Sequence, residues 1–272
     1  MPVSIIAVQG PQPLGLPDDR QAADATDINA RGDVIGWLFQ PSLPCPPNTV
    51  CFAGHSFFAP RGGAPILFDV PGAVATFAFG INAGGDIVGE YSDGSTTHGF
   101  LRDRGGRFTT IDFPGEPFTV ITGINAAGTM VGYYIHDIET EEASATGFVL
   151  DRGGFHVLPA PDVRPRAIAE DGTVVGSAFD FEQHPFIFRD GVFTRFDCPG
   201  AAFTELHDVL PDGTLLGVML PGGTSPVEGF ISSNGGCESL GAGVYAEGIN
   251  AKGTIVGQLF APAGGGPFVW QR

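Results

Sequence analysis

The chain is short of positive charge. It has 13 lysine and arginine residues against 30 aspartate and glutamate residues, which gives a formal net charge of −17. No stretch is rich in basic residues, so neither nucleic acid nor an anionic membrane is an expected partner. The sequence also lacks an apolar run of about 18 residues, the length that a membrane-spanning helix needs. It begins without the basic and apolar regions of a signal peptide, so we expect a cytoplasmic protein, with a secreted mature form as the alternative.

The motifs of metal and cofactor sites are missing as well. The sequence contains no zinc-type spacing of cysteine and histidine, no P-loop, no dinucleotide fingerprint and no Gly-x-Ser-x-Gly turn. We therefore expect neither a metal nor a cofactor. There are only four cysteines. Cys45 and Cys51 share one loop and could form a bridge there. Cys198 and Cys237 are predicted to lie near opposite faces of the molecule, too far apart to bond.

Helical periodicity is absent, and glycine and proline fall at recurring turn positions. In its place, one ten-residue phrase occurs six times. Its first copy reads Asp-Ile-Asn-Ala-Arg-Gly-Asp-Val-Ile-Gly, and the six copies end at Gly36, Gly89, Gly132, Gly176, Gly217 and Gly257. A copy therefore recurs every 40 to 53 residues. Periods of this length are typical of propellers, solenoids and repeat arrays.

Each repeat predicts four short antiparallel strands. The Asn-x-x-Gly turn joins two β-branched runs into a hairpin, and two more strands follow, such as residues 98–102 and 108–113. The last unit stops after its third strand, and residues 3–9 resemble a fourth strand. We therefore predict an all-β fold: a six-bladed β-propeller of four-stranded antiparallel blades, closed by the N-terminal strand completing the last blade. Residues 1–272 form a single domain in this prediction.

The third strand of each unit carries a triplet that ends in phenylalanine. The triplets are residues 55–57, 98–100, 146–148, 184–186, 228–230 and 266–268, and three of them begin with histidine. With the Ile-Asn-x-x-Gly and Val-Gly elements, they resemble the bacterial "probable extracellular repeat" family, which is named for a His-Ala-Phe (HAF) triplet. The resemblance spans the whole chain. It implies a propeller-like fold and an extracellular setting, and almost no chemistry.

We expect a function where the units differ. Strand direction places the Asn-x-x-Gly turns on one face, the bottom, and the variable loops on the other, the top. Three positions near the top differ from unit to unit, two of them on the inner strand and the third on the second strand. The first holds Thr26, Phe79, Thr122, Arg166, His207 and Glu247; the second Asp24, Phe77, Val120, Arg164, Glu205 and Tyr245; the third Trp37, Glu90, Tyr133, Ser177, Val218 and Gln258.

These positions predict one asymmetric pocket at the mouth of the central channel, with aromatic walls opposite charged groups. A lectin tends to repeat its binding residues in every blade, whereas here the frame repeats and the mouth does not. This favours one site for one aromatic or polycyclic, partly anionic small molecule, in a monomeric protein. The expected ligand-binding residues are Trp37, Phe77, Phe79, Arg164, Glu205 and Tyr245.

Arg166, His207 and Glu247 lie at one level on three successive units. His207 is suited to move a proton near neutral pH, Glu247 to orient it, and Arg166 to bind negative charge. Tyr133 and Glu90 face them as a second acid or base. The hypothesis is an enzyme with cofactor-free acid/base chemistry: isomerisation, cyclisation, elimination or hydrolysis. Three alternatives stay open: a structural ion cluster, a non-catalytic module that binds a ligand or carbohydrate outside the cell, and a scaffold without a pocket.

Two longer segments and two aspartates add smaller hypotheses. Residues 10–24 and 40–54 both belong to the first unit. They either form a lid over the mouth or are loops whose extra length has no function, which a ring protein tolerates at little cost. Asp27 and Asp208 precede the repeated apolar position, where other units have glycine or alanine. They either face the channel or cap turns, and capping is the preferred interpretation.

Overall fold

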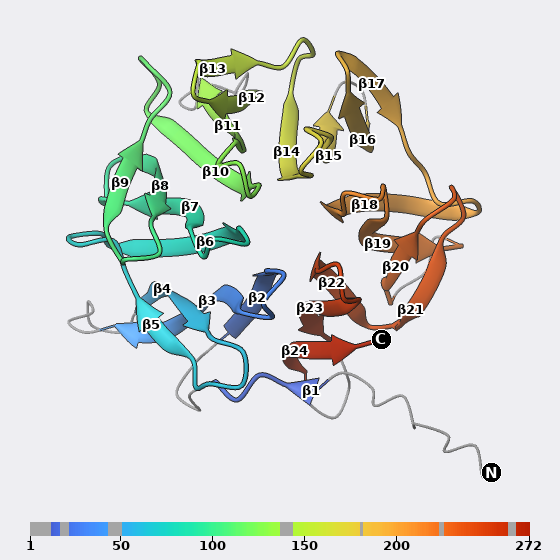
Figure 1. Cartoon of the computed structure of the whole chain (residues 1–272), viewed down its shortest axis with the longest axis horizontal. Helices are drawn as coiled ribbons and strands as arrows, with labels where there is room; N and C mark the ends of the chain where they lie inside the picture. The colour runs from blue at the N-terminus through green and yellow to red at the C-terminus, as the bar shows by residue number, and fades with distance from the viewer. Residues whose placement is uncertain are drawn as a thin grey trace.

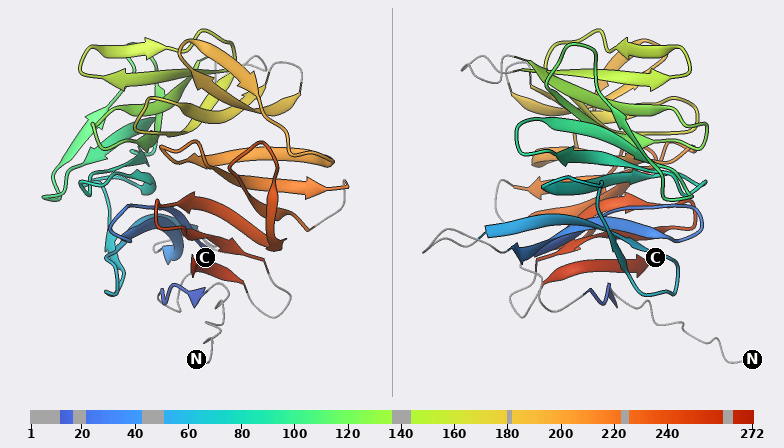
Figure 2. Two further views of the ribbon diagram at one scale, coloured as in Figure 1. Left: turned by 45° about the vertical axis from the view of Figure 1, so that its right-hand side comes forward. Right: turned by 90° about the vertical axis from the view of Figure 1, so that its left-hand side faces the viewer.

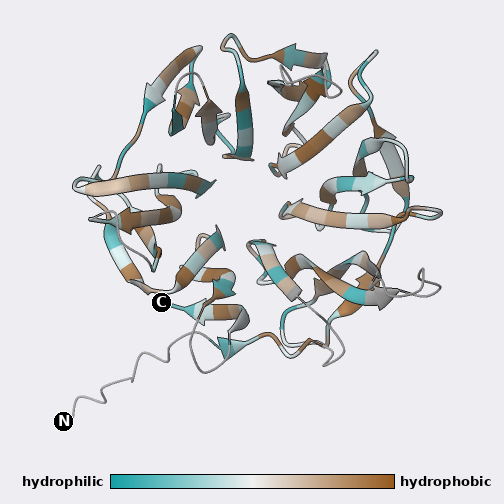
Figure 3. Cartoon of the chain, turned by 180° about the vertical axis from the view of Figure 1, so that it is seen from behind, coloured by the Kyte–Doolittle hydropathy of each residue, from teal (hydrophilic) through white to brown (hydrophobic). Residues whose placement is uncertain are grey.

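The computed structural model describes residues 12–16, 22–42, 51–136, 144–179, 182–222, 226–260 and 265–272. This part of the chain folds into short antiparallel strands arranged as a ring (Figure 1). Seen from the side, the strands of neighbouring sheets are stacked one above another (Figure 2). Apolar and polar residues alternate along many of the strands (Figure 3), as expected when one face of a sheet is buried.

Four of the sheets are discrete four-stranded blades. In three of them the strands follow chain order from the centre outward. The first has β2 (Ala22–Ile28), β3 (Val34–Ser42), β4 (Cys51–Ala59) and β5 (Ile66–Phe68); the second has β14 (Val163–Ile168), β15 (Val174–Phe179), β16 (Gln183–Arg189) and β17 (Val192–Arg195); the third has β18 (Ala201–Val209), β19 (Leu215–Pro221), β20 (Glu228–Ser232) and β21 (Glu238–Ala242). The fourth has β22 (Val244–Ile249), β23 (Thr254–Leu259), β24 (Gly266–Gln271) and, at its outer edge, β1 (Gln12–Pro13).

The remaining strands form one eight-stranded sheet. It contains two meanders that are joined where Phe118 pairs in parallel with Thr97. The first meander has β6 (Ala75–Ile81), β7 (Ile87–Ser92), β8 (Thr97–Arg102) and β9 (Phe108–Ile111); the second has β10 (Phe118–Ile124), β11 (Met130–His136), β12 (Ser144–Asp151) and β13 (Gly154–Val157).

The predicted fold class is therefore corrected. The chain is an all-β propeller, but the predicted six separate blades are wrong, because the described sheets are four four-stranded blades and one eight-stranded sheet. The cause is the start of β10, which lies close enough to the start of β8 to pair with it. The predicted closing strand, residues 3–9, lies outside the described residues, and β1 pairs with β24 only through Gln12 and Pro13.

The repeated phrase forms a turn and a contact to the next sheet. In the turn at Asn125, the side-chain oxygen accepts the Thr129 N–H at 3.0 Å, and Gly128 has a φ of 81°, which glycine adopts without strain. The Asn125 Nδ2 donates to the Ala169 carbonyl at 3.3 Å, at the same turn of the following repeat. Asn29, Asn82 and Asn250 make the equivalent bond, and Asn250 reaches Asn29 near the other end of the chain.

The glycine that ends each phrase is explained by close packing on both sides. A Cβ on Gly36 would overlap the Asp24 carbonyl oxygen and would lie 2.7 Å from the Phe57 ring. Phe57 and the corresponding phenylalanines of the other five triplets each have at most 1% of their surface exposed. Burying a side chain of this size stabilises the fold by about 2 kcal/mol. The phenylalanine of the triplet is therefore a core residue of the propeller.

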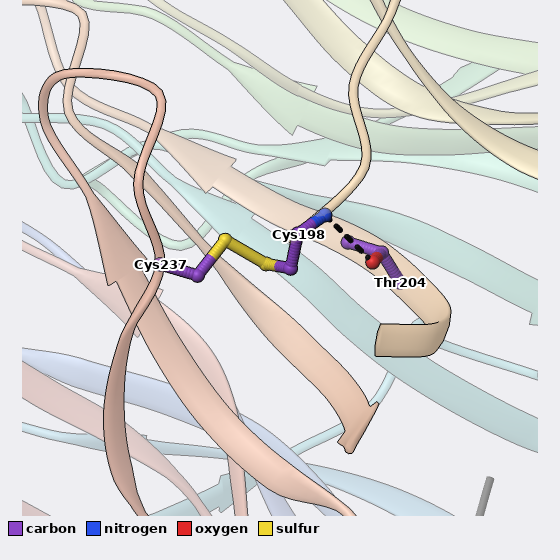
Figure 4. Close-up of a disulfide and its surroundings, with 3 residues drawn as sticks. All are labelled: Cys198, Thr204 and Cys237. Carbon is purple, nitrogen blue, oxygen red and sulfur yellow. Dashed lines mark hydrogen bonds between the residues drawn. A yellow bond between two sulfur atoms is a disulfide. The ribbon is translucent and has the colours of Figure 1, made fainter. Parts of the chain in front are cut away.

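The predicted separation of Cys198 and Cys237 is wrong. They form a disulfide with Cα atoms 5.6 Å apart (Figure 4). The connection from β17 to β18 folds across the β18–β21 blade, where the Cys198 N–H donates to Thr204 Oγ1 at 3.1 Å and Cys198 joins the buried cluster around Phe230. The cysteine therefore lies inside the sheet-to-sheet core, beside the segment that leads into β21. Cys45 and the side chain of Cys51 lie outside the described residues.

The two long segments of the first unit lie largely outside the described residues too, so the lid hypothesis stays a prediction. The described part of the second segment shows that β3 and β4 stay paired as far as Ser42 and Cys51. No helix in the described ranges is long and apolar enough to cross a membrane.

Candidate functional site

A cavity of about 370 Å³ lies at the centre of the propeller, between its innermost strands. Most of the predicted site residues line it. These are Trp37, Phe79, Tyr133, Arg164, Arg166, Glu205, His207, Tyr245 and Glu247. Phe77 and Glu90 are not among the lining residues. The lining differs from sheet to sheet, because most of the positions that vary between the repeats meet here.

A β-bulge explains why one of these positions can vary. In each inner strand the pairing shifts by one residue, for example between Leu206 and Asp208 opposite β19. The residue that is skipped has no Cα partner in the ladder, and a bulge re-aims its side chain. The skipped residues are Thr26, Phe79, Thr122, Arg166, His207 and Glu247, which is the first of the varying rows.

Arg166 and Glu247 form an ion pair across the ring centre. Arg166 Nη2 lies 2.7 Å from Glu247 Oε2, and the two residues come from β14 and β22. Glu247 is 9% exposed, whereas 43% of the Arg166 side chain is exposed. The same carboxylate oxygen lies 3.3 Å from His207 Nδ1. The predicted grouping of these three side chains is therefore present in the structure.

His207 is held by acceptors on both sides of its ring. Its Nδ1–H donates to the Ala246 carbonyl at 2.8 Å, and Nε2 lies 3.4 Å from Glu205 Oε2. Burial alone would raise the pKa of Glu205, but the hydrogen bond and charge of His207 and the charge of Arg166 hold the pKa below its ordinary value. Only 3% of the His207 side chain is exposed.

Glu205 gathers two further donors. Gln183 Nε2 donates to Oε1 at 2.6 Å, and the Tyr245 hydroxyl donates to Oε2 at 3.2 Å. Glu205 is thus an ionised acceptor at the cavity wall, fixed by neutral donors and by His207. Its position four residues before the repeated apolar residue places it on the same inner strand, β18, as His207.

The Nδ1 bond of His207 has counterparts elsewhere in the ring. Thr26 Oγ1 donates to the Ala78 carbonyl at 2.9 Å, and Thr122 Oγ1 donates to the Pro165 carbonyl at 2.8 Å. In all three cases the acceptor is the residue just before the next skipped residue. His207 Nδ1 therefore performs a structural task, whereas Nε2 lies beside the Glu205 carboxylate at the cavity wall.

Asp24 is a cavity residue to which the sequence argument assigned no role. Its Oδ1 is buried without a hydrogen-bond partner. Burial and the nearby charge of Glu247 raise the pKa of Asp24 to about 7, against the smaller opposing effects of Arg166 and His207. Asp24 occupied one of the varying positions, so its place was visible in the sequence, but the burial of its carboxyl group was not.

Glu90 and Tyr133 form the far side of the predicted mouth. Burial raises the pKa of Glu90 to about 7, and burial together with the charge of Glu90 raises the pKa of Tyr133. Tyr133 reaches the cavity and Glu90 does not line it. Phe77 packs edge-on against Trp37 and Phe39, with ring centroids 5.7 and 5.8 Å away. It therefore supports the aromatic wall from behind.

Asp27 and Asp208 face a smaller cavity of about 50 Å³ in the same central channel. Each carboxylate accepts the N–H of the following residue and one N–H of the next inner strand: Asp27 from Ile81 at 2.8 Å and Asp208 from Ile249 at 2.8 Å. The preferred interpretation as turn caps is therefore replaced by a bond between sheets. Burial and mutual repulsion raise the pKa of Asp27 to about 8. Among the described residues, no group of three or more potential ligands is placed to hold a metal ion.

Comparison with known proteins identifies the fold. No family model matches the chain, and no curated protein matches it in sequence. Among solved structures it is similar to TolB from Acinetobacter baumannii (TM-score 0.60, 14% identity, 95% of this chain and 66% of that chain). It is also similar to a gluconolactonase from Xanthomonas campestris (TM-score 0.55, 14% identity, 98% of each chain) and to virginiamycin B lyase from Staphylococcus aureus (TM-score 0.53, 14% identity, 96% and 98%). At this identity the likeness shows the propeller fold alone, which hosts enzymes and other proteins alike.

Proposed function

We propose that the central cavity binds one small molecule that carries a flat ring, and acts on it by acid/base chemistry. The observation that carries the proposal is the lining: every sheet of the ring contributes a different side chain to one cavity of about 370 Å³. This volume is within the usual range of small-molecule pockets. The aromatic side, with Trp37 and Phe79, suits a ring, and the opposite side holds groups that transfer protons.

The proton-transfer group in this proposal is His207. Its Nδ1–H is fixed on the Ala246 carbonyl, so the ring has one orientation and one tautomer when neutral. Nε2 then takes up or delivers the proton, and Glu205 stabilises the protonated ring at 3.4 Å. Isomerisation, cyclisation, elimination and hydrolysis all fit this arrangement. Glu247 holds Arg166 at the same level, so that the charge of Arg166 is already compensated.

The fold supports an enzyme without specifying the reaction. A gluconolactonase and a virginiamycin B lyase share the propeller at 14% identity. Their names describe different reactions on different molecules, so this chain's substrate is argued from its own cavity.

A filled-cavity variant tests the proposal. Val120 lines the cavity, so Val120→Trp reduces its volume, while Val74→Trp adds the same residue at a position that is 62% exposed. We expect ring-bearing fragments in a crystallographic screen to occupy the centre of the wild type and of Val74→Trp, and to be excluded from Val120→Trp. Fragments that ignore the difference between the two variants, or a centre that stays empty in the wild type, would show the proposal to be wrong.

A non-catalytic binding protein is the second candidate, and one observation favours it. His207 is only 3% exposed, and its Nδ1 bond matches those of Thr26 and Thr122, which do not titrate. For any molecule that binds, His207→Gln separates the two. Turnover that the wild type shows and the variant loses, with binding retained, supports catalysis by His207, whereas a bound molecule that even the wild type does not convert supports binding alone.

A further inference from the structure

Arg164 carries a positive charge that no carboxylate of the described residues neutralises. Its guanidinium carbon lies 4.5 Å from the Phe179 ring centroid and 5.8 Å from that of Tyr133, so two aromatic faces hold it. Its Nε is buried without a hydrogen-bond partner. Arg166, two residues later on the same strand, is by contrast bound to Glu247 at 2.7 Å. The charge that is available to a ligand is therefore that of Arg164.

Two hydroxyl groups lie beside this charge. Ser177 pairs directly with Arg164 between β14 and β15, so both side chains leave the same face of the blade. Tyr133 contacts Arg164 through its ring. The structure gives neither hydroxyl a hydrogen-bond partner within the described part of the chain, and all three residues line the cavity. Burial raises the pKa of Tyr133, so its hydroxyl stays protonated and acts as a donor.

We propose that Arg164, Ser177 and Tyr133 form an anion site that binds the carboxylate of an aromatic carboxylate ligand. This inference rests on the proposed small-molecule function and names the class of molecule. The flat guanidinium fork matches the two oxygens of a carboxylate. A single unpaired arginine, in a cavity that the ionised Glu205 and the Glu247 carboxylate also line, favours one negative charge over the two of a phosphate monoester. The ring of the ligand then lies toward Trp37 and Phe79.

Trp37 provides a reporter for this site. The chain has two tryptophans, so in a Trp270→Phe background all tryptophan emission comes from Trp37 at the cavity wall. The probes are naphthoate and its neutral amide, naphthamide, which have nearly the same shape. In this background we expect naphthoate to bind at least about tenfold more tightly than naphthamide, because a charge-assisted hydrogen bond is worth at least that factor.

Substitution of Arg164 tests whether this residue causes the preference for naphthoate over naphthamide. Arg164→Gln is expected to weaken naphthoate about tenfold and to leave naphthamide within about twofold, and Arg164→Lys to give an intermediate value because it keeps the charge without the fork. Arg189→Gln, on an exposed side chain bound to Asp171, is the control and leaves both affinities unchanged.

The outcomes separate this inference from the function on which it rests. Equal binding of naphthoate and naphthamide, or an equal loss of both in Arg164→Gln, overturns the anion site while the small-molecule function stands. If neither probe alters Trp37 emission up to its solubility limit, both the anion site and a cavity for flat aromatic molecules are rejected. Circular dichroism spectra of the variants establish that each one is folded.

Discussion

Arg166 and Glu247 are 81 residues apart in the sequence, yet Arg166 Nη2 lies 2.7 Å from Glu247 Oε2 at the ring centre. Both are the residue that a β-bulge leaves unpaired in its inner strand. The same irregularity, repeated around the ring, thus brings distant parts of the chain into one small volume.

Loss of Arg166 should destabilise the fold. Arg166→Met leaves the Glu247 carboxylate, which is 9% exposed, without its cation, and we expect a decrease in the free energy of unfolding of about 2 kcal/mol. Because Arg166 is partly exposed, this is less than the loss for a fully buried pair. The double variant Arg166→Met/Glu247→Gln should recover part of it. Urea unfolding of the wild type, Arg166→Met, Glu247→Gln and the double variant measures these losses. A loss in the double variant that equals or exceeds the sum of the two single losses contradicts the pairing.

Asp24 should make stability depend on pH. Its pKa is about 7 in the fold against an ordinary value of 3.8, so between about pH 4 and pH 7 the folded chain holds a proton that the unfolded chain releases. This contribution is full at low pH and is lost as the pH rises through about 7. Asp24→Asn should therefore match the wild type near pH 4 and exceed it in melting temperature at pH 8.

The control for this experiment is Asp190→Asn, which removes the same charge from a side chain that is 93% exposed. Its melting temperature should follow that of the wild type at both pH values. A parallel shift of Asp24→Asn at pH 4 and pH 8 would show that the carboxyl group is not the cause.

The disulfide should contribute substantially to stability. Cys198 and Cys237 are 39 residues apart, and closing a loop of that length stabilises a fold by about 4 kcal/mol in the chain-entropy model. We expect Cys198→Ser/Cys237→Ser to lower the free energy of unfolding accordingly, with part of the loss due to the buried position of Cys198. Peptide mapping under non-reducing conditions identifies the bridge. A purified wild type in which both thiols are alkylated without reduction would contradict it.

The asparagine of the repeated phrase should matter more than its neighbours. Asn125→Ala removes the acceptor for Thr129 N–H and the donor to the Ala169 carbonyl, so we expect a loss of about 2 kcal/mol. Lys252→Ala changes an exposed position of the equivalent turn in the last repeat, at Asn250, and should alter stability by less than about 0.5 kcal/mol. Chemical denaturation compares the free energies of unfolding of the two variants. A loss in Asn125→Ala as small as that in Lys252→Ala would mean that the turn does not need the asparagine side chain.

The glycine that ends each repeated phrase, on the strand that pairs with the bulged inner strand, should be irreplaceable. A Cβ on Gly132 would overlap the Val120 carbonyl oxygen, whereas a Cβ on Gly236 meets nothing within 4 Å. We expect Gly132→Ala to lower the free energy of unfolding by about 3 kcal/mol. Gly236→Ala should have little effect. Thermal melts of the two alanine variants give the answer, and a Gly132→Ala protein as stable as Gly236→Ala would rule out the close approach.

Much of the candidate site could be predicted because residues at the same position of different repeats lie at the same height in the ring. Arg166, His207 and Glu247 hold the same register in three copies, so equal register meant equal height at the centre. The identity of the hydrogen-bond partners could not be predicted in this way. The bond from His207 Nδ1 to the Ala246 carbonyl depends on the bulge at His207. No single residue type in the sequence indicates such a bulge.

The errors in the sheet count and in the cysteine separation have a different origin, since they arise where the chain leaves the repeat. The pairing of Phe118 with Thr97 depends on how a connection approaches the preceding strand, and it joins two meanders into one sheet. Cys198 lies on another connection, which folds inward over a blade instead of following its rim. Loop paths of this kind are set by packing between sheets, and strand periodicity contains no information about them.

The bulges also separate the residues that line the central cavity from those that hold the sheets together. Each skipped residue stands outside the hydrogen-bonded ladder, and the six positions already hold threonine, phenylalanine, arginine, histidine and glutamate. Mutation there changes the lining of the central cavity, while the glycines, asparagines and phenylalanines that hold the sheets together stay in place. A propeller of this type can therefore change the lining of its centre one residue at a time, at a cost in stability where the skipped residue is bonded to another inner strand, as Arg166 and His207 are.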